Sequence, residues 1–306
     1  MTVFSFKQAQ QLESIADFLR YGISCANHAA LYYGHGSDNA WDDMLALVLG
    51  TLSLPSDVHA ALLQARLTSD EKILLSKQLE KRIVMRIPVP YLLKQAHFCG
   101  LSFYIDERAL IPRSPFAELI EQQFEPWVVA DNVTRVLDLC TGSACIAIAC
   151  CYAFPDAAVD AIDLSKDALA VAEINRAQHA VSEQLTLIES DCFDALEAQQ
   201  YDIIVSNPPY VNHDEMQTLP KEYQHEPVLA LEAEENGLAI VEKILNTAHD
   251  YLTDQGVLIV EVGNSDEALI KKYPDVPFTW LEFERGGEGV FLLTKAQLSQ
   301  FRNKNA

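Results

Sequence analysis

An alternation of short apolar runs and helical patterns after Thr134 constrains the fold of this chain more than any other feature. The intervals between the runs are long enough for helices, and parallel neighbours in a sheet need such crossovers. The alternation therefore predicts an α/β fold, in which a mainly parallel sheet carries helices on both faces. A glycine-rich turn, Gly286-Gly287-Glu288-Gly289, indicates that the last two strands form an antiparallel hairpin. The expected sheet has seven strands, at residues 134–140, 157–163, 185–190, 201–206, 256–263, 280–284 and 290–294, with 201–206 in its middle.

The strand at 201–206 leads directly into Asn207-Pro208-Pro209-Tyr210. Neither proline has an N–H group to give to a sheet, so the strand must end there. Pro208 also restricts Asn207 to extended backbone, which holds a side-chain amide at the carboxyl end of the strand. Ligands of open α/β sheets bind at that edge. The Asn207 side-chain carbonyl and a neighbouring backbone carbonyl can both accept hydrogen bonds from one NH2 group, and the motif therefore indicates a site for such a group.

Three other strands end in residues that suit a nucleoside. The turn after the first strand reads Asp138-Leu139-Cys140-Thr141-Gly142-Ser143-Ala144, and its glycine lets a ligand approach the backbone. It lacks the Gly-x-Gly-x-x-Gly spacing of the dinucleotide fingerprint. Asp163 ends the second strand, where a carboxylate can accept from two ribose hydroxyls, and Asp191 follows the third, where it can meet an adenine edge. Each aspartate alone is also a common turn residue, but together with Asn207 on one sheet edge they predict a nucleoside site.

Residues 1–97 form an expected helical domain without a chemical motif. Apolar residues at helical spacing predict helices over Gln8–Leu19 and Trp41–Leu52, the second with Asp38 or Asn39 as its N-cap. A capping box at Thr68-Ser69-Asp70-Glu71 opens a third helix. Substrate docking and simple cover of the neighbouring domain are both open as roles.

A short hairpin over residues 98–110, turning near Asp106-Glu107, is the expected linker into a catalytic domain of residues 98–306. It leads into a rigid loop and helix start at Ile111–Glu118. Arg113 in this loop is expected to pair with a carboxylate, either of the protein or of a ligand.

Composition limits the partners and the compartment. The formal net charge is −22, which disfavours general nucleic-acid binding and favours a basic protein partner, although solubility alone also explains it. The seven cysteines include no Cys-x-x-Cys pair and are expected as small core residues of a cytoplasmic protein, without disulfides and without a metal site. We expect no signal peptide and no membrane span, because no apolar stretch is long enough.

Several motifs resemble those of class I S-adenosylmethionine-dependent methyltransferases. The Asn-Pro-Pro-Tyr motif is shared by members that methylate planar-conjugated nitrogens, namely adenine N6 in DNA and the side-chain amide of protein glutamine. The stretches 111–118, 138–143, 225–227 and 280–283 resemble the glutamine methyltransferases of ribosomal protein L-three, whereas the release-factor branch typically has Pro-Arg-Pro and an acidic residue in the first of them. The likeness covers nearly the whole chain, because this family also has an N-terminal helical domain.

The resemblance implies S-adenosylmethionine as the cofactor and a class I, Rossmann-like seven-stranded sheet. It places the turn after the first strand by the methionine part, Asp163 on the ribose, and Asp191 with Cys192 on the adenine. One departure is Ala144, which stands where the family usually has glycine and whose methyl group is expected to crowd the methionine part. Asn207 is assigned to the cofactor as well as to the substrate, and the turn residues assigned to the cofactor are Asp138, Cys140, Thr141, Gly142 and Ser143.

The implied reaction is methyl transfer to the side-chain amide nitrogen of a glutamine in the large-subunit ribosomal protein L-three. Asn207 and the Pro208 carbonyl would bind the glutamine NH2, Pro209 would complete the rigid motif, and Tyr210 would pack against the amide plane. An amide nitrogen is a poor nucleophile, because its lone pair is delocalised into the carbonyl. Two acceptors on its hydrogens stabilise the positive charge that grows as the methyl group arrives, so no metal is required.

Three alternatives stay open. A release-factor glutamine methyltransferase would use the same site. A DNA adenine methyltransferase would use the motif on a flipped base, but the charge of −22 and the lack of a basic recognition region argue against it. A protein-binding module that kept the fold without catalysis is the third, and Ala144 is its only hint.

Overall fold

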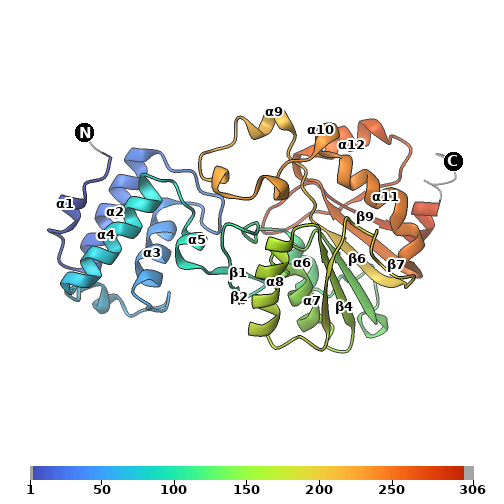
Figure 1. Ribbon diagram of the computed structural model, residues 1–306, viewed down its shortest axis with the longest axis horizontal. Helices are drawn as coiled ribbons and strands as arrows, with labels where there is room; N and C mark the ends of the chain where they lie inside the picture. Colours follow the sequence, from blue (N-terminus) through green and yellow to red (C-terminus); the bar gives the residue numbers. More distant parts are fainter. Residues whose placement is uncertain (1–2, 300–306) are drawn as a thin grey trace. The chain divides into compact units, whose positions relative to one another are not determined.

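The computed structural model describes residues 3–299, which form two compact units (Figure 1). The helical unit contains the chain up to Ala96 together with the short segments 105–107 and 220–225. The larger unit contains residues 97–104, 108–219 and the chain from Glu226 onward. Two short segments from later in the chain thus belong to the helical unit, and the docking role expected for residues 1–97 stays a prediction. Within residues 3–299 every helix is too short or too polar to cross a membrane.

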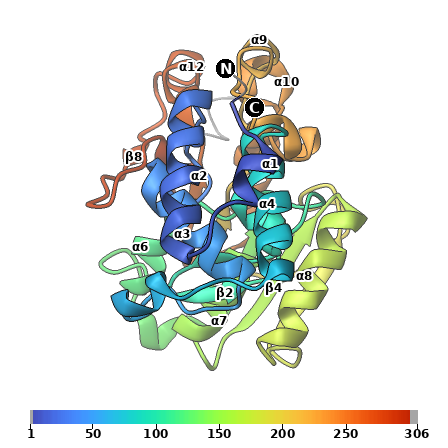
Figure 2. The ribbon, with the colours of Figure 1, turned by 90° about the vertical axis from the view of Figure 1, so that its left-hand side faces the viewer.

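Polar caps define where the helices of the helical unit begin. Asn39 accepts a hydrogen bond from the backbone of Asp42, and Thr68 forms the expected capping box with Glu71. Figure 2 shows the principal helices of this unit packed alongside one another. Their buried apolar residues form one core. They are α1 (Phe6–Ala9), α2 (Ile15–Ala29), α3 (Ala40–Thr51), α4 (Ser69–Ile83) and α5 (Val89–Leu93), with a 3-10 turn, η1, at Ala60–Gln64.

The single helix expected over Gln8–Leu19 is wrong. The first helix ends at Ala9 and a new one starts at Ile15. Ser14 and Asp17 form a capping box, in which each side chain accepts from the other residue's backbone N–H. This local pair satisfies the N–H groups that a helix start exposes, so it overrides the continuous apolar stripe.

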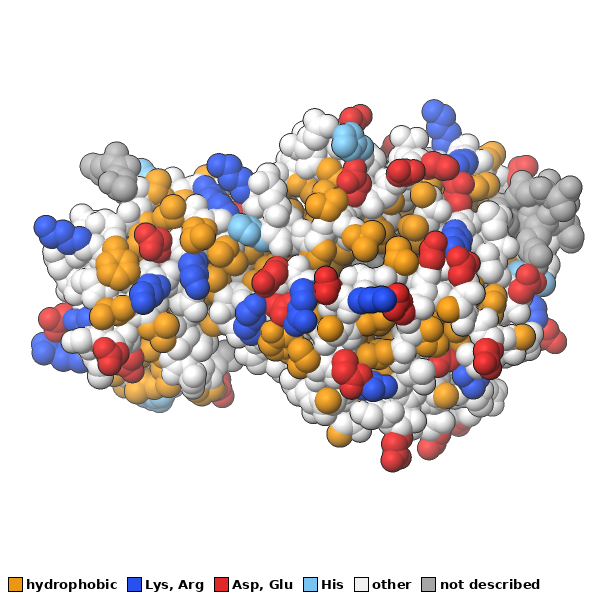
Figure 3. Space-filling view, in the orientation of Figure 1, with side chains coloured by type: hydrophobic (Ala, Val, Ile, Leu, Met, Phe, Trp, Pro, Cys, Tyr) orange, Lys and Arg blue, Asp and Glu red, His pale blue; other side chains and the backbone are white. Residues whose placement is uncertain are grey.

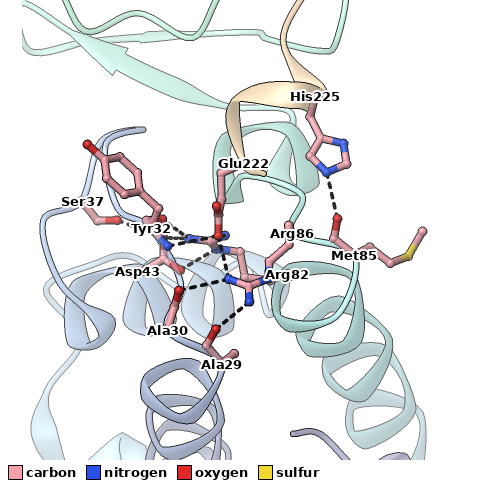
Figure 4. Close-up of polar contacts among 10 residues, drawn as sticks. All are labelled: Ala29, Ala30, Tyr32, Ser37, Asp43, Arg82, Met85, Arg86, Glu222 and His225. Atoms are coloured by element: carbon pink, nitrogen blue, oxygen red, sulfur yellow. Dashed lines mark hydrogen bonds and ion pairs between the residues drawn. The ribbon is translucent and has the colours of Figure 1, made fainter. Parts of the chain in front are cut away.

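A buried cluster of four charged side chains holds the segment Pro220–His225 in the helical unit (Figure 4). Arg82 Nε lies 2.7 Å from Asp43 Oδ2, and Arg86 Nη1 lies 3.1 Å from Glu222 Oε1. Asp43, Arg82 and Glu222 are almost fully buried. Two cations and two carboxylates balance each other, which offsets their lost hydration, and removal of any one would leave a buried charge unpaired.

The larger unit is built on the seven-stranded sheet that the sequence predicts. Its order is β5-β4-β3-β6-β7-β9-β8, so β6, which precedes Asn207, is the middle strand as expected. Strands β3 to β7 are mutually parallel, and β9 is antiparallel to both β7 and β8. The strands are β3 (Arg135–Leu139), β4 (Ala158–Asp163), β5 (Leu185–Glu189), β6 (Tyr201–Ser206), β7 (Leu252–Glu261), β8 (Thr279–Trp280) and β9 (Val290–Thr294).

Helices cover both faces of this sheet, and an apolar cluster fills each side. Successive residues of β6 point to opposite faces, so Ile203 and Val205 join one cluster and Ile204 joins the other. The first cluster packs under α7 and the second under α11, as the layers in Figure 1 show. The helices are α6 (Phe116–Glu121), α7 (Cys145–Ala153), α8 (Lys166–Gln178), α11 (Ala239–Tyr251) and α12 (Asp266–Lys272), with short turns α9 (His213–Met216) and α10 (Glu234–Gly237).

Two expectations about hairpins need correction. The hairpin expected over 98–110 pairs β1 (Ala96–Phe98) with β2 (Leu101–Phe103), and it turns at Cys99-Gly100 rather than near Asp106-Glu107. Both turn residues have positive φ, 48° and 70°, which suits a tight two-residue hairpin turn.

The strand expected at 280–284 is the second correction, because β8 ends at Trp280. The backbone N–H groups of Glu284 and Arg285 instead donate to the carboxylate of Glu118 on α6. These two N–H groups would donate to a neighbouring strand if β8 were longer, but the distant side chain of Glu118 accepts from them instead.

Candidate active site

The carboxyl ends of the parallel strands form one edge of the sheet, and a cavity opens there in the larger unit. Leu139 at the end of β3 pairs with both Ile162 of β4 and Ser206 of β6, so these strands end at the same level. Seven of the residues expected in the site line the cavity: Cys140, Gly142, Asp163, Asp191, Cys192, Asn207 and Pro209. Five others, Asp138, Thr141, Ser143, Pro208 and Tyr210, lie outside the lining.

The turn between β3 and α7 is shaped by three left-handed backbone positions. Cys140, Gly142 and Ala144 have φ values of 60°, 57° and 62°. A Cβ atom at Gly142 would meet nothing within 4 Å, so this glycine leaves open space on the cavity side. Ala144 is fully buried in the core at the N-cap of α7 and is not among the lining residues. Its methyl group therefore does not line the cavity, and the crowding of the methionine part stays a prediction. What the structure shows at Ala144 is a left-handed backbone, which is strained for alanine.

Asp138 holds this turn from beneath. Its Oδ2 accepts from Thr141 Oγ1 at 2.6 Å and from the backbone of Ala147 at 3.2 Å. Its Oδ1 is buried and has no hydrogen-bond partner among the described residues. Burial raises the pKa of Asp138 to about 7, because a carboxylate loses hydration in the protein interior.

Asp163, at the end of β4, ties the turn to the cavity wall. Its carboxylate accepts from the backbone N–H groups of Gly142 and Ser165, each at 2.8 Å. Burial raises its pKa, and these backbone bonds partly offset the effect. Because each carboxylate oxygen has further lone pairs, Asp163 can still accept from a ligand on the cavity side.

The residues after β5 form the opposite wall. Asp191 is half exposed and lies 2.9 Å from Lys243 Nζ. Cys192 is buried, and its hydrogen bond with Cys140, together with burial, raises the pKa of the Cys140 thiol well above its ordinary value. Cys140 therefore stays a neutral thiol at the cavity wall. Within residues 3–299, no group of three or more His, Cys, Asp or Glu side chains is placed to hold a metal ion.

Asn207 and Tyr210 leave β6 in different directions. Asn207 and Pro209 line the cavity, whereas Tyr210 reaches β7, where its hydroxyl donates to Glu261 Oε1 at 3.2 Å. A Cβ at Gly263 would lie 2.6 Å from Tyr210 Cε2, and one at Gly237 would lie 2.1 Å from the Tyr210 carbonyl oxygen. Both glycines are therefore required for the close packing around Tyr210.

Arg113 forms a salt bridge inside the larger unit. Its guanidinium binds both carboxylate oxygens of Glu226, at 2.6 and 2.9 Å, and Glu226 also accepts from the backbone of Ile111. Of the two possibilities left open by the sequence, the structure shows the protein carboxylate. This pair fixes the loop that precedes α6 to the chain beside Pro227, which lines the cavity.

Sequence reasoning missed a second set of site residues. Glu261 could have been found, because it ends a strand beside β6 in the same way as Asp163 ends β4. Glu261 lies outside the cavity lining but contacts Tyr210. The lining residues that the sequence did not indicate carry no chemical motif, and only the folded chain brings them together. They are Arg108, Ala109, Leu110, Ile162, Leu164, Ser165, Ala168, Ser190, Pro227, Leu229, Ala230 and Ile240.

The cavity suits a nucleoside that carries an amino-acid arm. Ile162, Leu164 and Ile240 give apolar walls, and Asp163 and Asp191 supply acceptors for hydroxyl and amino groups. The open space beside Gly142 lets a ligand approach the backbone. These features fit S-adenosylmethionine, the cofactor that the sequence resemblance implies.

Comparison with known proteins gives consistent matches. The family model described as the methyltransferase small domain matches residues 122–223. A protein of Francisella tularensis named "Ribosomal protein uL3 glutamine methyltransferase" is 47% identical, over 95% of this chain and 93% of its own length. A protein of the same name from Xanthomonas campestris pv. campestris is 49% identical, over 95% of this chain and 94% of its own length.

Proposed function

Because the chain belongs to the family of ribosomal protein uL3 glutamine methyltransferases, we propose that it methylates the side-chain amide nitrogen of a glutamine in ribosomal protein uL3. The observation that carries the proposal is the position of Asn207. It follows the middle strand of the sheet and lines a cavity together with Asp163 and Asp191. An amide acceptor and a nucleoside site are thereby combined in one place.

The cofactor half of the cavity is assigned to S-adenosylmethionine, which supplies a methyl group activated by its sulfonium charge. Asp163 accepts from the ribose hydroxyls, and Asp191 with Cys192 borders the adenine. The turn at Cys140–Ser143 presents its backbone to the methionine part. Asp138 and Thr141 act through this turn, because they hold it from beneath and do not line the cavity.

Asn207 and the Pro208 carbonyl are assigned to the substrate glutamine. Their oxygens accept from the two hydrogens of the amide NH2, which fixes the nitrogen and stabilises the positive charge that develops on it. Pro208 and Pro209 keep this part of the backbone stiff, so the acceptors are aligned before the substrate arrives. Such alignment can contribute about 7–11 kcal/mol to lowering the barrier.

Substrate capture is assigned to charge and to the helical unit. The net charge of −22 attracts a basic ribosomal protein. On the face drawn in Figure 3, lysines and arginines are scattered among acidic and apolar side chains rather than gathered as a phosphate-binding surface would need. A docking role for residues 1–97 remains part of this proposal, and so does the cytoplasmic location that a ribosomal substrate requires.

In the test, the purified enzyme is mixed separately with ribosomal protein uL3, a release factor and duplex DNA, each time with labelled S-adenosylmethionine. We expect label on a glutamine of uL3 alone, and KM should rise with ionic strength more than kcat falls, because salt screens exposed charges. Label in adenine or only in the release factor would refute the substrate. Label on arginine or lysine would refute the amide chemistry.

Variants of the site separate its two halves. Asn207→Ala should lower kcat about 10²–10³-fold with cofactor affinity retained, because one lost acceptor acts on transition-state charge. Asp163→Ala should first raise the cofactor Kd, since it removes the ribose acceptor and releases the Gly142 N–H. Asn132→Ala, at an exposed position before β3, is the matched control and should leave both constants unchanged. Normal turnover in Asn207→Ala would contradict the assigned role.

A further inference from the structure

Glu261 is a buried carboxylate whose two oxygens each receive a hydroxyl group. Tyr210 Oη donates to Oε1 at 3.2 Å, and Ser114 Oγ donates to Oε2 at 2.6 Å. Ser114 Oγ also accepts from the backbone N–H of Phe116 at 3.2 Å, which orients its own hydrogen toward Glu261. Two hydroxyl donors suit an ionised carboxylate, which can only accept.

The ring and the backbone carbonyl of Tyr210 are also fixed by close contacts. Its ring packs on the backbone of Gly263, where no Cβ would fit. Its carbonyl oxygen accepts from Ser265 Oγ at 2.9 Å and lies against Gly237. Glu261 therefore completes a set of contacts that allows the ring a single orientation.

The charge of Glu261 is maintained against burial. Burial raises the pKa of its carboxyl group, while the hydrogen bonds from Ser114 and Tyr210 and the charge of Arg113 counteract the rise. The titratable or charged groups that face it are thus Tyr210 and Arg113, and Arg113 is itself paired with Glu226. Among the described residues no cation is in direct contact with the carboxylate, so the two hydroxyl donors, together with the more distant charge of Arg113, are what favour its ionised form.

We propose that Glu261 is a positioning residue for the methyl transfer: its carboxylate fixes the plane of Tyr210, and Ser114 fixes the carboxylate. The inference rests on the proposed function, and it takes for Tyr210 the role that the sequence resemblance implies, namely packing of its ring against the substrate amide. Neither Glu261 nor Tyr210 is among the residues that line the cavity, and the contact of Glu261 with Tyr210 is the hydrogen bond to its hydroxyl, so Glu261 acts on the substrate through the orientation of that ring. Its loss should therefore reduce turnover and leave cofactor binding intact.

The test is a double-mutant cycle of Glu261→Gln and Tyr210→Phe, with methyl transfer to uL3 as the readout. An amide offers only one acceptor oxygen, so Glu261→Gln cannot receive both hydroxyls. Each single variant should lower kcat about 10- to 100-fold, as expected for a hydrogen bond to a charged group. The double variant should be no slower than the worse single variant, with cofactor Kd, measured by calorimetry, within about twofold of wild type.

Two further measurements separate positioning from simple structural support. On lowering the pH, wild-type kcat should fall as Glu261 is protonated, and this acid limb should be absent from Glu261→Gln. Ser114→Ala should lower kcat by a smaller factor and add nothing to Glu261→Gln. If Glu261→Gln does not fold, a double-mutant cycle of Ser114→Ala and Tyr210→Phe replaces the first cycle. The effects of these two substitutions on kcat should again be less than multiplicative.

The inference would be overturned if the effects of the two substitutions multiplied in the double variant, or if Glu261→Gln kept turnover within about twofold while Tyr210→Phe lost it. Its failure is distinguishable from failure of the proposed function. An inactive Asn207→Ala with a fully active Glu261→Gln overturns only the positioning role. An active Asn207→Ala overturns the site assignment itself.

Discussion

Asp138 gives the sharpest prediction about stability, because its carboxyl group is fully buried beneath the cofactor turn. Its folded-state pKa of about 7 compares with an ordinary value of 3.8. Between these values the unfolded chain has released the proton and the folded chain keeps it. The unfolded state then binds fewer protons, so the free energy of unfolding falls as the pH rises from about 4 to about 7.

The size of the effect follows from the shift. A difference of roughly three pH units at about 1.36 kcal/mol each gives a loss of ~4 kcal/mol, complete above about pH 8. Asp138→Asn keeps an acceptor for Thr141 and Ala147 but cannot ionise. Its NH2 group would take the place of Oδ1, which has no partner among the described residues, at a cost of ~1–3 kcal/mol. We therefore expect a net gain of roughly 1–3 kcal/mol at pH 8 that disappears toward pH 4.5.

The assay is urea unfolding between pH 4.5 and pH 8 without cofactor, followed by tryptophan fluorescence. A Trp41→Phe background leaves Trp127 and Trp280, which both belong to the larger unit. Asp156→Asn, at an exposed position, is the charge-matched control, and we expect it to change the free energy of unfolding little because its side chain is exposed to solvent. An equal difference between Asp138→Asn and its parent at both pH extremes would refute titration of Asp138 in this range.

Three further predictions concern the turn between β3 and α7, the packing of Tyr210, and the salt bridge between Arg113 and Glu226. Ala144→Gly should stabilise the protein by about 1 kcal/mol in urea unfolding, because it relieves a left-handed alanine, and it should leave the cofactor Kd unchanged. Gly263→Ala should lower kcat at least tenfold in the methyl-transfer assay, since the new Cβ would lie 2.6 Å from Tyr210 and must displace it. Glu226→Gln should lower the free energy of unfolding by about 3 kcal/mol, because Arg113 loses its carboxylate partner.

The sheet and the carboxyl ends of its parallel strands were predictable because their signals are local. A buried strand shows as a short apolar run, and the alternation with helices fixes its parallel neighbours. The capping box at Thr68 and the cap at Asn39 were read correctly for the same reason. The capping box at Ser14 is equally local, but the continuous apolar stripe around it favours one longer helix, and for this reason the prediction at Gln8–Leu19 is wrong.

Partnerships between distant residues could not be predicted, because no local pattern encodes them. Ser114 and Glu261 are 147 positions apart, and Arg86 and Glu222 are 136 apart. Asp138 and Asp163 illustrate the consequence, since both stand at the carboxyl ends of neighbouring strands and both were assigned to the cofactor. In the folded chain only Asp163 lines the cavity, whereas Asp138 is covered by Thr141.

A carboxylate at a strand end is thus evidence for a site, but its partners decide what it does there. Asp163 lies beside open space and can accept from a ligand. Asp138 is covered by its own turn, so burial favours its neutral form. Glu261 receives two hydroxyl groups and can hold Tyr210. Carboxylates at the same sheet edge therefore serve binding, support of a turn and orientation of an aromatic ring. Each receives two donors, so the identity of the donors and the open cavity beside Asp163 distinguish the three, not the number of donors.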